Sequence, residues 1–256
     1  MSNDLRVEHD GALATIVFCR ERGLNILSSA FLKELDLAWA GLSSSGARVC
    51  ILRGEGKAFM AGADIKEMTA FDGAAARSFA ALGQDVFEKI ETSPIVSIAA
   101  IHGHCLGGGC ELALSCDIRV GSTGMLIGQP EVNIGLIPGF GGSQRLPRVI
   151  GTGWALRMIL SGEPLNENTA LAAGLITDSG DPGDLAARAE KLARTILSRG
   201  PHAVKIAKGL TRSALNTTQS AGMLLERQAF GETFQNGEAR EGTGAFLEKR
   251  PPKFSS

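Results

Sequence analysis

Short apolar runs alternate with longer amphipathic segments over the first half of the chain. Residues 13–18 (LATIVF), 48–52 (RVCIL) and 95–101 (IVSIAAI) have the length and the β-branched content of buried strands. Residues 28–42 and 73–91 carry apolar side chains at helical spacing, which predicts two amphipathic helices. Strands that alternate with helices are typical of an α/β domain, for which a doubly wound sheet is the generic expectation.

The rest of the chain contains a run of glycines and, after it, mostly apolar residues at helical spacing. Three glycines at 107–109 introduce a predicted helix that ends near Cys116, and strand-like runs follow at residues 117–120 and 125–128. Beyond about residue 147 the spacing of apolar residues predicts a series of helices, at 151–161, 166–173, 183–199, 203–216 and 220–232. The sequence EKRPPKF near the C-terminus predicts an extended tail.

Composition narrows the possible partners. The 256 residues include 26 basic and 27 acidic side chains, a formal net charge of −1, so nucleic acid is a poor default partner. The N-terminus is polar and no apolar run approaches the ~18 residues of a membrane span, so we expect a cytoplasmic protein that does not bind membranes. Five cysteines without a CxxC pair favour reduced, packed thiols over disulfides or zinc.

Two glutamates stand out from their apolar, glycine-rich surroundings. Glu111 lies in CLGGGCELALSCD and Glu131 lies in GQPEVNIGLIPGFGGSQRLPR. A carboxylate is costly to bury unless it is paired, hydrogen-bonded or used in chemistry. Two such carboxylates predict acid/base catalysis, and the nearby glycines allow backbone N–H groups to approach an oxyanion closely.

These segments together resemble one protein family. KAFMAGADIKEM, HGHCLGGGCELALSCDIRV, the Glu131 segment and the tail EGTGAFLEKRPPKF are similar to the enoyl-CoA hydratase (crotonase) family. The similarity extends from the LATIVF run to Phe254. It implies an α/β spiral of ββα repeats in residues 1–195, in place of a doubly wound sheet. It also implies a helical trimerisation region in residues 196–256, and assembly into a homotrimer or a homohexamer.

The resemblance assigns chemistry to particular residues. It implies that Glu111 and Glu131 add water to an acyl-CoA thioester, with the backbone N–H groups of Ala61 and Gly108 as the oxyanion hole. No metal and no separate cofactor are expected, because coenzyme A is part of the substrate. The substrate contacts that the resemblance implies are Ala61, Gly62, Ala63, Asp64, Ile65, Gly108, Gly139, Phe230 and Lys249.

Less specific interpretations compete with each assignment. Glu111 could be a helix-capping carboxylate, Glu131 a turn residue and the three glycines packing residues. Neither His102 nor His104 is expected to act as a base, and Cys105 is expected to be a buried side chain rather than a nucleophile. At the level of function, the rivals of a hydratase are an enoyl-CoA isomerase, a non-catalytic RNA-binding relative and an assembly scaffold.

Overall fold

The chain is built around two sheets, and between residues 49 and 128 successive strands alternate between them. The computed structural model describes residues 4–20 and 24–254. The larger sheet has the order β1-β2-β3-β5-β7; only β1 and β2 pair antiparallel. Its strands are β1 (Leu5–Asp10), β2 (Leu13–Phe18), β3 (Val49–Gly54), β5 (Val96–Ile101) and β7 (Ile118–Gly121).

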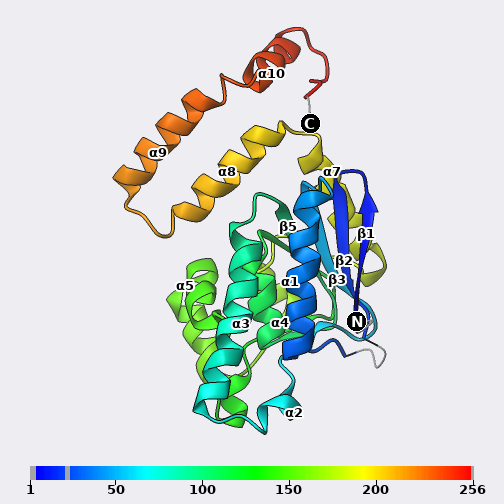
Figure 1. Cartoon of the computed structure of the whole chain (residues 1–256), viewed down its shortest axis with the longest axis vertical. Helices are drawn as coiled ribbons and strands as arrows, with labels where there is room; N and C mark the ends of the chain where they lie inside the picture. Colours follow the sequence, from blue (N-terminus) through cyan, green and yellow to red (C-terminus); the bar gives the residue numbers. More distant parts are fainter. Residues whose placement is uncertain (1–3, 21–23, 255–256) are drawn as a thin grey trace.

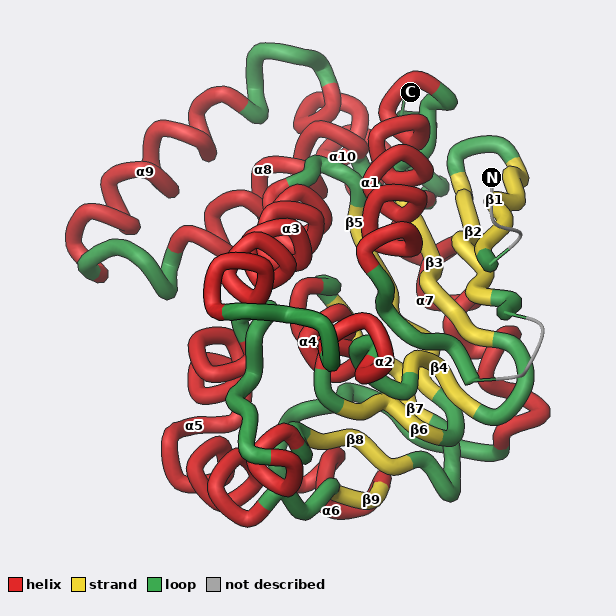
Figure 2. Tube along the Cα trace, turned by 60° about the horizontal axis from the view of Figure 1, so that its bottom comes forward, coloured by secondary structure: helices red, strands yellow, loops and turns green. Residues whose placement is uncertain are grey.

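The smaller sheet collects the short strands that follow the long ones. Its order is β4-β6-β8-β9, formed by β4 (Ala58–Met60), β6 (His104–Leu106), β8 (Leu126–Gly128) and β9 (Leu165–Asn166). After β1 and β2, which both belong to the larger sheet, three successive turns of the chain each give one strand to the larger sheet, one to the smaller sheet and then helical structure (Figure 2). This is the spiral of ββα repeats, and the generic expectation of a doubly wound sheet is wrong because the strands divide between two sheets.

Helices cover both faces of the larger sheet. One face packs on α1, α3 and α4, and the main hydrophobic core lies between them. A second, smaller core on the opposite face is closed by Leu185, Ala189 and Ala193 of α7. The helices of the spiral are α1 (Ser29–Ser44), α2 (Ile65–Met68), α3 (Gly73–Thr92), α4 (Gly108–Ser115), α5 (Gly142–Ser161) and α6 (Glu167–Ala172), with 3-10 turns η1 (Glu131–Ile134) and η2 (Pro182–Asp184).

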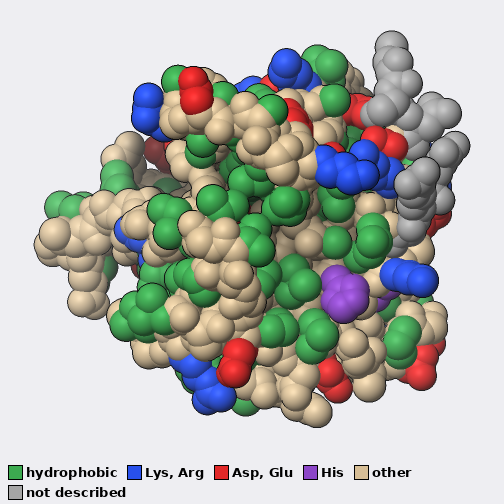
Figure 3. Space-filling model, turned by 90° about the horizontal axis from the view of Figure 1, so that it is seen from below, with side chains coloured by type: hydrophobic (Ala, Val, Ile, Leu, Met, Phe, Trp, Pro, Cys, Tyr) green, Lys and Arg blue, Asp and Glu red, His purple; other side chains and the backbone are tan. Residues whose placement is uncertain are grey.

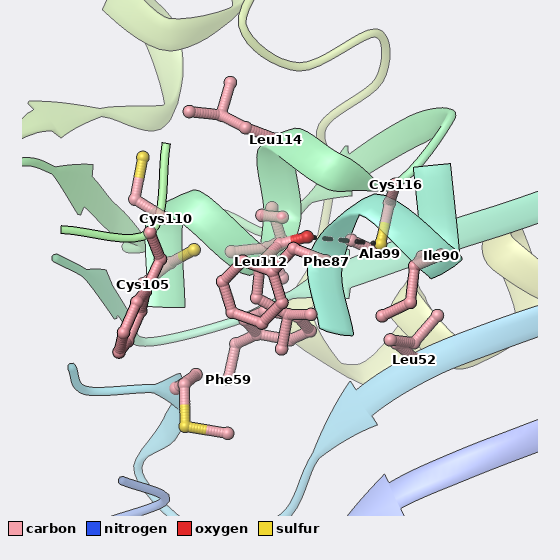
Figure 4. Packing of buried hydrophobic residues seen from close by; sticks show 14 of the residues in the cluster. Leu52, Phe59, Phe87, Ile90, Ala99, Cys105, Cys110, Leu112, Leu114 and Cys116 are labelled. Atoms are coloured by element: carbon pink, nitrogen blue, oxygen red, sulfur yellow. Dashed lines mark hydrogen bonds between the residues drawn. The ribbon is translucent and has the colours of Figure 1, made fainter. Parts of the chain in front are cut away.

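The short helix α4 is buried on all sides. Every residue from Gly108 to Ser115 is buried. Figure 4 shows Leu112 among the core side chains, with its carbonyl accepting from the Cys116 thiol. A Cβ on Gly109 would lie 2.1 Å from the Met60 carbonyl oxygen, so this glycine lets α4 pack directly on β4. The site that α4 carries is therefore held by the core itself.

The C-terminal helices extend away from the spiral. They are α7 (Leu185–Leu197), α8 (Pro201–Ser213), α9 (Gln219–Glu232) and α10 (Glu238–Leu247), and Figure 1 shows α9 and α10 projecting from the body of the molecule. No residue of α9 is buried in the single chain. The predicted boundary after residue 195 falls within the last turn of α7 and remains a prediction. Within residues 4–20 and 24–254, no helix has the length and apolar character needed to cross a membrane.

Candidate active site

A cavity of about 630 Å³ brings the two singled-out glutamates together. Glu111 from α4 and Glu131 from η1 both line it, along with Ala61, Gly108 and Gly139. Most of its other walls are apolar side chains from α2, α3 and the loop after η1. The face at the α2 and α5 end carries many hydrophobic side chains, with charged ones mainly around its edge (Figure 3). Such a cavity suits a largely apolar ligand with a few polar groups at its reactive end.

Glu111 is a buried carboxylate with two backbone donors. Glu111 is only 1% exposed, and its Oε1 accepts hydrogen bonds from the N–H groups of Phe140 and Gly142, both at 2.7 Å. Burial raises its pKa from 4.5 to about 7, although the bonds from Gly142 and Phe140 act in the opposite direction. A carboxyl group with this pKa can both accept and release a proton near neutral pH.

Glu131 is partly buried and faces the N-terminal end of α4. A Cβ on Gly107 would lie 3.2 Å from Glu131 Oε1, which places the carboxylate beside the glycine that precedes α4. With the Gln129 amide turned to donate, its nitrogen lies 2.8 Å from the same oxygen. Burial raises the pKa of Glu131, and the charge of Glu131 in turn adds to the raised pKa of Glu111. The charge of Glu131 thus acts on Glu111 across one cavity.

The predicted oxyanion donors are only partly supported. Gly108 lines the cavity in the first turn of α4, where backbone N–H groups have no partner within the helix. Ala61 also lines the cavity, but its N–H donates to the Asn25 carbonyl at 2.7 Å and is not free to bind an oxyanion. The prediction that Ala61 supplies a donor is therefore wrong.

The loop that contains Ala61 pairs with Leu27 as a strand would, and this pairing decides which N–H groups are free. Leu27 donates to the Gly62 carbonyl and accepts from the Asp64 N–H, both at 2.8 Å. Ala63 lies between those two residues, and its N–H has no hydrogen-bond partner among residues 4–20 and 24–254. Ala63 also lines the cavity. The loop therefore offers a free donor two residues later than the sequence suggested.

The remaining predicted substrate contacts divide into two groups. Gly62, Ile65 and Gly139 line the cavity. Asp64 does not line it, and its carboxylate caps α2 by accepting from the Lys66 and Glu67 N–H groups; its predicted contact with the substrate stays a prediction.

The two predicted C-terminal contacts lie away from this cavity. Phe230 is 66% exposed on α9, and Lys249 follows the end of α10. Neither lines the cavity formed by the single chain. Their predicted contact with the substrate therefore stays a prediction.

Residues near the glycine run fill structural positions. His102 Nε2 lies 3.1 Å from the Gly56 carbonyl, and the buried Cys105 thiol contacts the Gly109 carbonyl at 3.4 Å. His102, His104 and Cys105 are all outside the cavity lining. Within the described part of the chain, no cluster of three or more His, Cys, Asp or Glu side chains is arranged to hold a metal ion.

Sequence patterns did not reveal the groups that support Glu111. Phe140 and Gly142 act through their backbone, and Arg145 contacts the Phe140 carbonyl at 2.8 Å. The only signal in the sequence is the run PGFGGSQR, where adjacent glycines allow a tight turn before a basic residue. That run predicts a constrained loop but not its contact with a carboxylate 29 residues earlier.

Comparison with known proteins agrees with this geometry. The enoyl-CoA hydratase/isomerase family model matches residues 8–256. A short-chain-enoyl-CoA hydratase from Clostridium acetobutylicum is 38% identical, over 97% of this chain and 96% of that protein. A crotonyl-CoA hydratase from Syntrophomonas wolfei is 39% identical, over 98% and 97%.

Solved structures give the same result for the fold. The crystal structure of an enoyl-CoA hydratase from Bacillus anthracis superposes with a TM-score of 0.94 at 34% identity. The alignment covers 98% of this chain and 99% of that one. A second structure, from Geobacillus kaustophilus, has a TM-score of 0.95 at 31% identity, covering 100% and 97%. The chain belongs to the enoyl-CoA hydratase/isomerase family.

Proposed function

We propose that the protein is an enoyl-CoA hydratase, which adds water reversibly and in syn fashion to a trans-2-enoyl-CoA to give a 3-hydroxyacyl-CoA. The observation that carries this proposal is the pair of glutamates with raised pKa values on one largely apolar cavity. The names of the similar proteins support the same reaction class. Degradation of fatty acids or related acyl-CoA compounds is the metabolic setting we infer.

The two carboxyl groups divide the proton transfers between them. In hydration, ionised Glu111 accepts a proton from the water whose oxygen bonds to C3. Protonated Glu131 delivers a proton to C2, so one carboxyl group gains a proton and the other loses one. In dehydration the roles reverse. Both groups have raised pKa values on one cavity, so each holds a proton more readily than an ordinary glutamate, which this division of labour needs.

Backbone donors would stabilise the charge that develops on the thioester oxygen. Addition at C3 moves electrons towards the carbonyl and forms an enolate. We assign the donors to the N–H groups of Gly108, at the positive end of α4, and Ala63. Loss of one such donor typically costs about 3–4 kcal/mol of transition-state stabilisation.

Steady-state hydration of crotonyl-CoA tests the proposal. We expect Glu111→Gln and Glu131→Gln each to lower kcat by about 10²–10⁴-fold, because each removes one proton-transfer group. The matched control is Glu163→Gln, since Glu163 is an exposed glutamate that does not line the cavity. Near-normal turnover in both cavity variants would eliminate the proposal.

Isomerisation is the nearest alternative within the family. Moving a double bond from C3 to C2 requires one well-placed carboxylate, whereas this cavity holds two. A product assay distinguishes the reactions, because hydration incorporates solvent oxygen and isomerisation does not. Bond migration without incorporation of water would reverse our preference.

Several broader features belong to the same proposal. The substrate supplies its own coenzyme A, and the chemistry assigned to the glutamates requires no metal or redox cofactor. We propose a cytoplasmic enzyme that does not bind nucleic acid, in keeping with the balanced charge of −1. We also propose a homotrimer, or a homohexamer of two trimers, formed through the C-terminal helices, whose α9 has no buried residue in the single chain.

A further inference from the structure

A continuous set of ion pairs and hydrogen bonds leads from the C-terminal helices to Glu111. Arg212 on α8 pairs with Glu91 Oε1 at 3.0 Å, near the end of α3. The other oxygen of Glu91 pairs with Arg145 Nε at 2.7 Å. Arg145 Nη1 then donates to the Phe140 carbonyl at 2.8 Å, in the loop whose N–H groups bind Glu111. The Glu111 carboxylate is thus connected to groups well outside the cavity.

The Arg145 side chain fits its loop closely. It is 15% exposed, and both its Nε and one of its Nη atoms have specific partners. A Cβ on Gly141, which has φ +105°, would lie 2.4 Å from Arg145 Nη1. Only glycine gives the guanidinium this room while adopting such a backbone conformation. The arrangement therefore requires matched features on the loop and on α5.

We propose that Arg145, anchored by Glu91, is a positioning residue that holds the Phe140 and Gly142 N–H groups against the Glu111 carboxylate. Without the guanidinium, the Phe140 carbonyl loses its partner and the turn at residues 140–142 is free to shift. The two donors to Glu111 belong to that turn. This inference rests on the proposed role of Glu111 as the base in hydration.

Electrostatics gives Arg145 a second influence on the same carboxylate. Besides burial and the two backbone donors, the groups that act on Glu111 are the Glu131 charge from η1 and the Arg145 charge from α5. Glu131 raises the pKa of Glu111 and Arg145 lowers it. Removing the Arg145 side chain therefore takes away a positive charge that favours ionised Glu111, and it weakens the hydrogen bonds from the Phe140 and Gly142 N–H groups that favour the same form.

The test is the pH profile of kcat/KM for crotonyl-CoA hydration. Arg145→Met removes the guanidinium, so we expect the acid limb of the profile to move to higher pH by about one unit. At pH values on the acid side of the limb, kcat/KM of the variant should be about tenfold lower than that of wild type. At pH values above the limb, kcat/KM should largely recover. Arg145→Lys keeps the charge but loses the paired contacts, and should shift the limb less. Glu91→Gln, which loosens the anchor, should act in the same direction as Arg145→Met.

Matched controls separate positioning from general structural damage. Arg148→Met removes an exposed arginine on the same helix that bonds only to the Gln144 carbonyl among the described residues, and should leave the profile unchanged. In a Glu111→Gln background, Arg145→Met should have almost no further effect on kcat/KM, because the group it acts through is gone.

Three results would overturn the inference. One is an Arg145→Met profile that coincides with wild type. Another is a loss of kcat/KM that is equal at all pH values. The third is an undiminished effect of Arg145→Met in the Glu111→Gln background. The proposed function fails separately, if wild type does not hydrate crotonyl-CoA or if Glu111→Gln alone has no effect.

Discussion

At the scale of single residues, the Glu111 carboxylate experiences two opposing influences. Burial among apolar side chains favours the protonated form, whereas the Phe140 and Gly142 N–H groups favour the ionised form. Burial is the larger influence and leaves the pKa at about 7. A carboxylate of ordinary pKa would be a weak base at neutral pH, so the apolar setting contributes directly to the proposed chemistry.

The raised pKa of Glu111 predicts a pH-dependent stability. Because the folded protein favours protonated Glu111, its contribution is fully present below the ordinary pKa of 4.5 and is lost as pH rises through about 7. At 1.36 kcal/mol per unit, this amounts to about 3 kcal/mol. Urea unfolding from pH 4 to about pH 8 should show wild type losing stability relative to Glu111→Gln by roughly that amount. Parallel pH dependences of the two proteins would contradict the assignment.

Residue patterns predicted the two carboxylates but not all of their surroundings. Glu111 and Glu131 were recognisable because each lies in an apolar, glycine-rich segment where an acid is unusual. The choice between Ala61 and Ala63 depends on how the loop pairs with Leu27, which no local pattern encodes. The contact of Arg145 with the Glu111 loop likewise arises only when distant segments pack together.

At the scale of elements, the close packing of α4 on β4 positions the site. Gly109 faces the Met60 carbonyl, and its first-turn neighbour Gly108 lines the cavity. The strands that carry this arrangement are short; β4, β6 and β8 have three residues each. Precision at the cavity therefore depends on the contact between backbones rather than on long sheet ladders.

Substitution of Gly109 tests this packing. Gly109→Ala places a Cβ 2.1 Å from the Met60 carbonyl oxygen, so we expect a loss of about 1–3 kcal/mol or more in the free energy of unfolding. Gly153→Ala on α5 is the matched control, because nothing lies within 4 Å of its Cβ; it should be neutral or stabilise the protein by up to about 1 kcal/mol. Equal stabilities in urea unfolding would show that α4 does not need this contact.

Long elements were more predictable than short ones. The predicted helix at 28–42 is α1, with Ser28 as its N-cap, and the helix at 73–91 is α3. Of the two- and three-residue strands, β8 was predicted by the strand-like run at 125–128, whereas β4, β6 and β9 were not, because so few residues show no detectable period. Helix α10 was not predicted either. Helix α5 begins at Gly142, earlier than predicted, and is broken at Gly151, where φ is 75°. The helix predicted at 151–161 corresponds to the part of α5 after this break.

At the scale of the whole molecule, the C-terminal helices present apolar side chains that the single chain does not cover. These large hydrophobic residues on α9 and α10 are Met223, Leu224, Leu225, Phe230, Phe246 and Leu247. Exposed apolar surface of this kind marks an interaction site. Self-association through these helices is the occupant that we propose.

Light scattering coupled to size exclusion tests that assembly. We expect wild type to elute as a trimer or hexamer, and Leu224→Glu and Phe230→Glu to shift it towards smaller species because each places a charge in the proposed interface. The matched control is Leu37→Glu, since Leu37 is 75% exposed on α1 and lies outside the C-terminal helices. A monomeric wild type, or equal effects of all three substitutions, would contradict the proposal.

The overall architecture could be predicted only in part from periodicity. Alternating strands and helices gave the α/β class, but the division of strands between two sheets depends on which strands pair across long distances. The spiral came from resemblance to a family with that fold, and the pairing of β3 with β5 and of β4 with β6 confirms it. Sequence patterning identifies elements more readily than their neighbours in space.

A crystal structure with bound acetoacetyl-CoA is the most direct test of the central claim. The account predicts that the Glu111 and Glu131 carboxylates lie beside the C2 and C3 atoms, with the thioester oxygen accepting from the N–H groups of Ala63 and Gly108. A ligand bound outside this cavity would contradict it. So would a thioester oxygen turned away from both backbone donors, or only one carboxylate within reach of the reacting carbons.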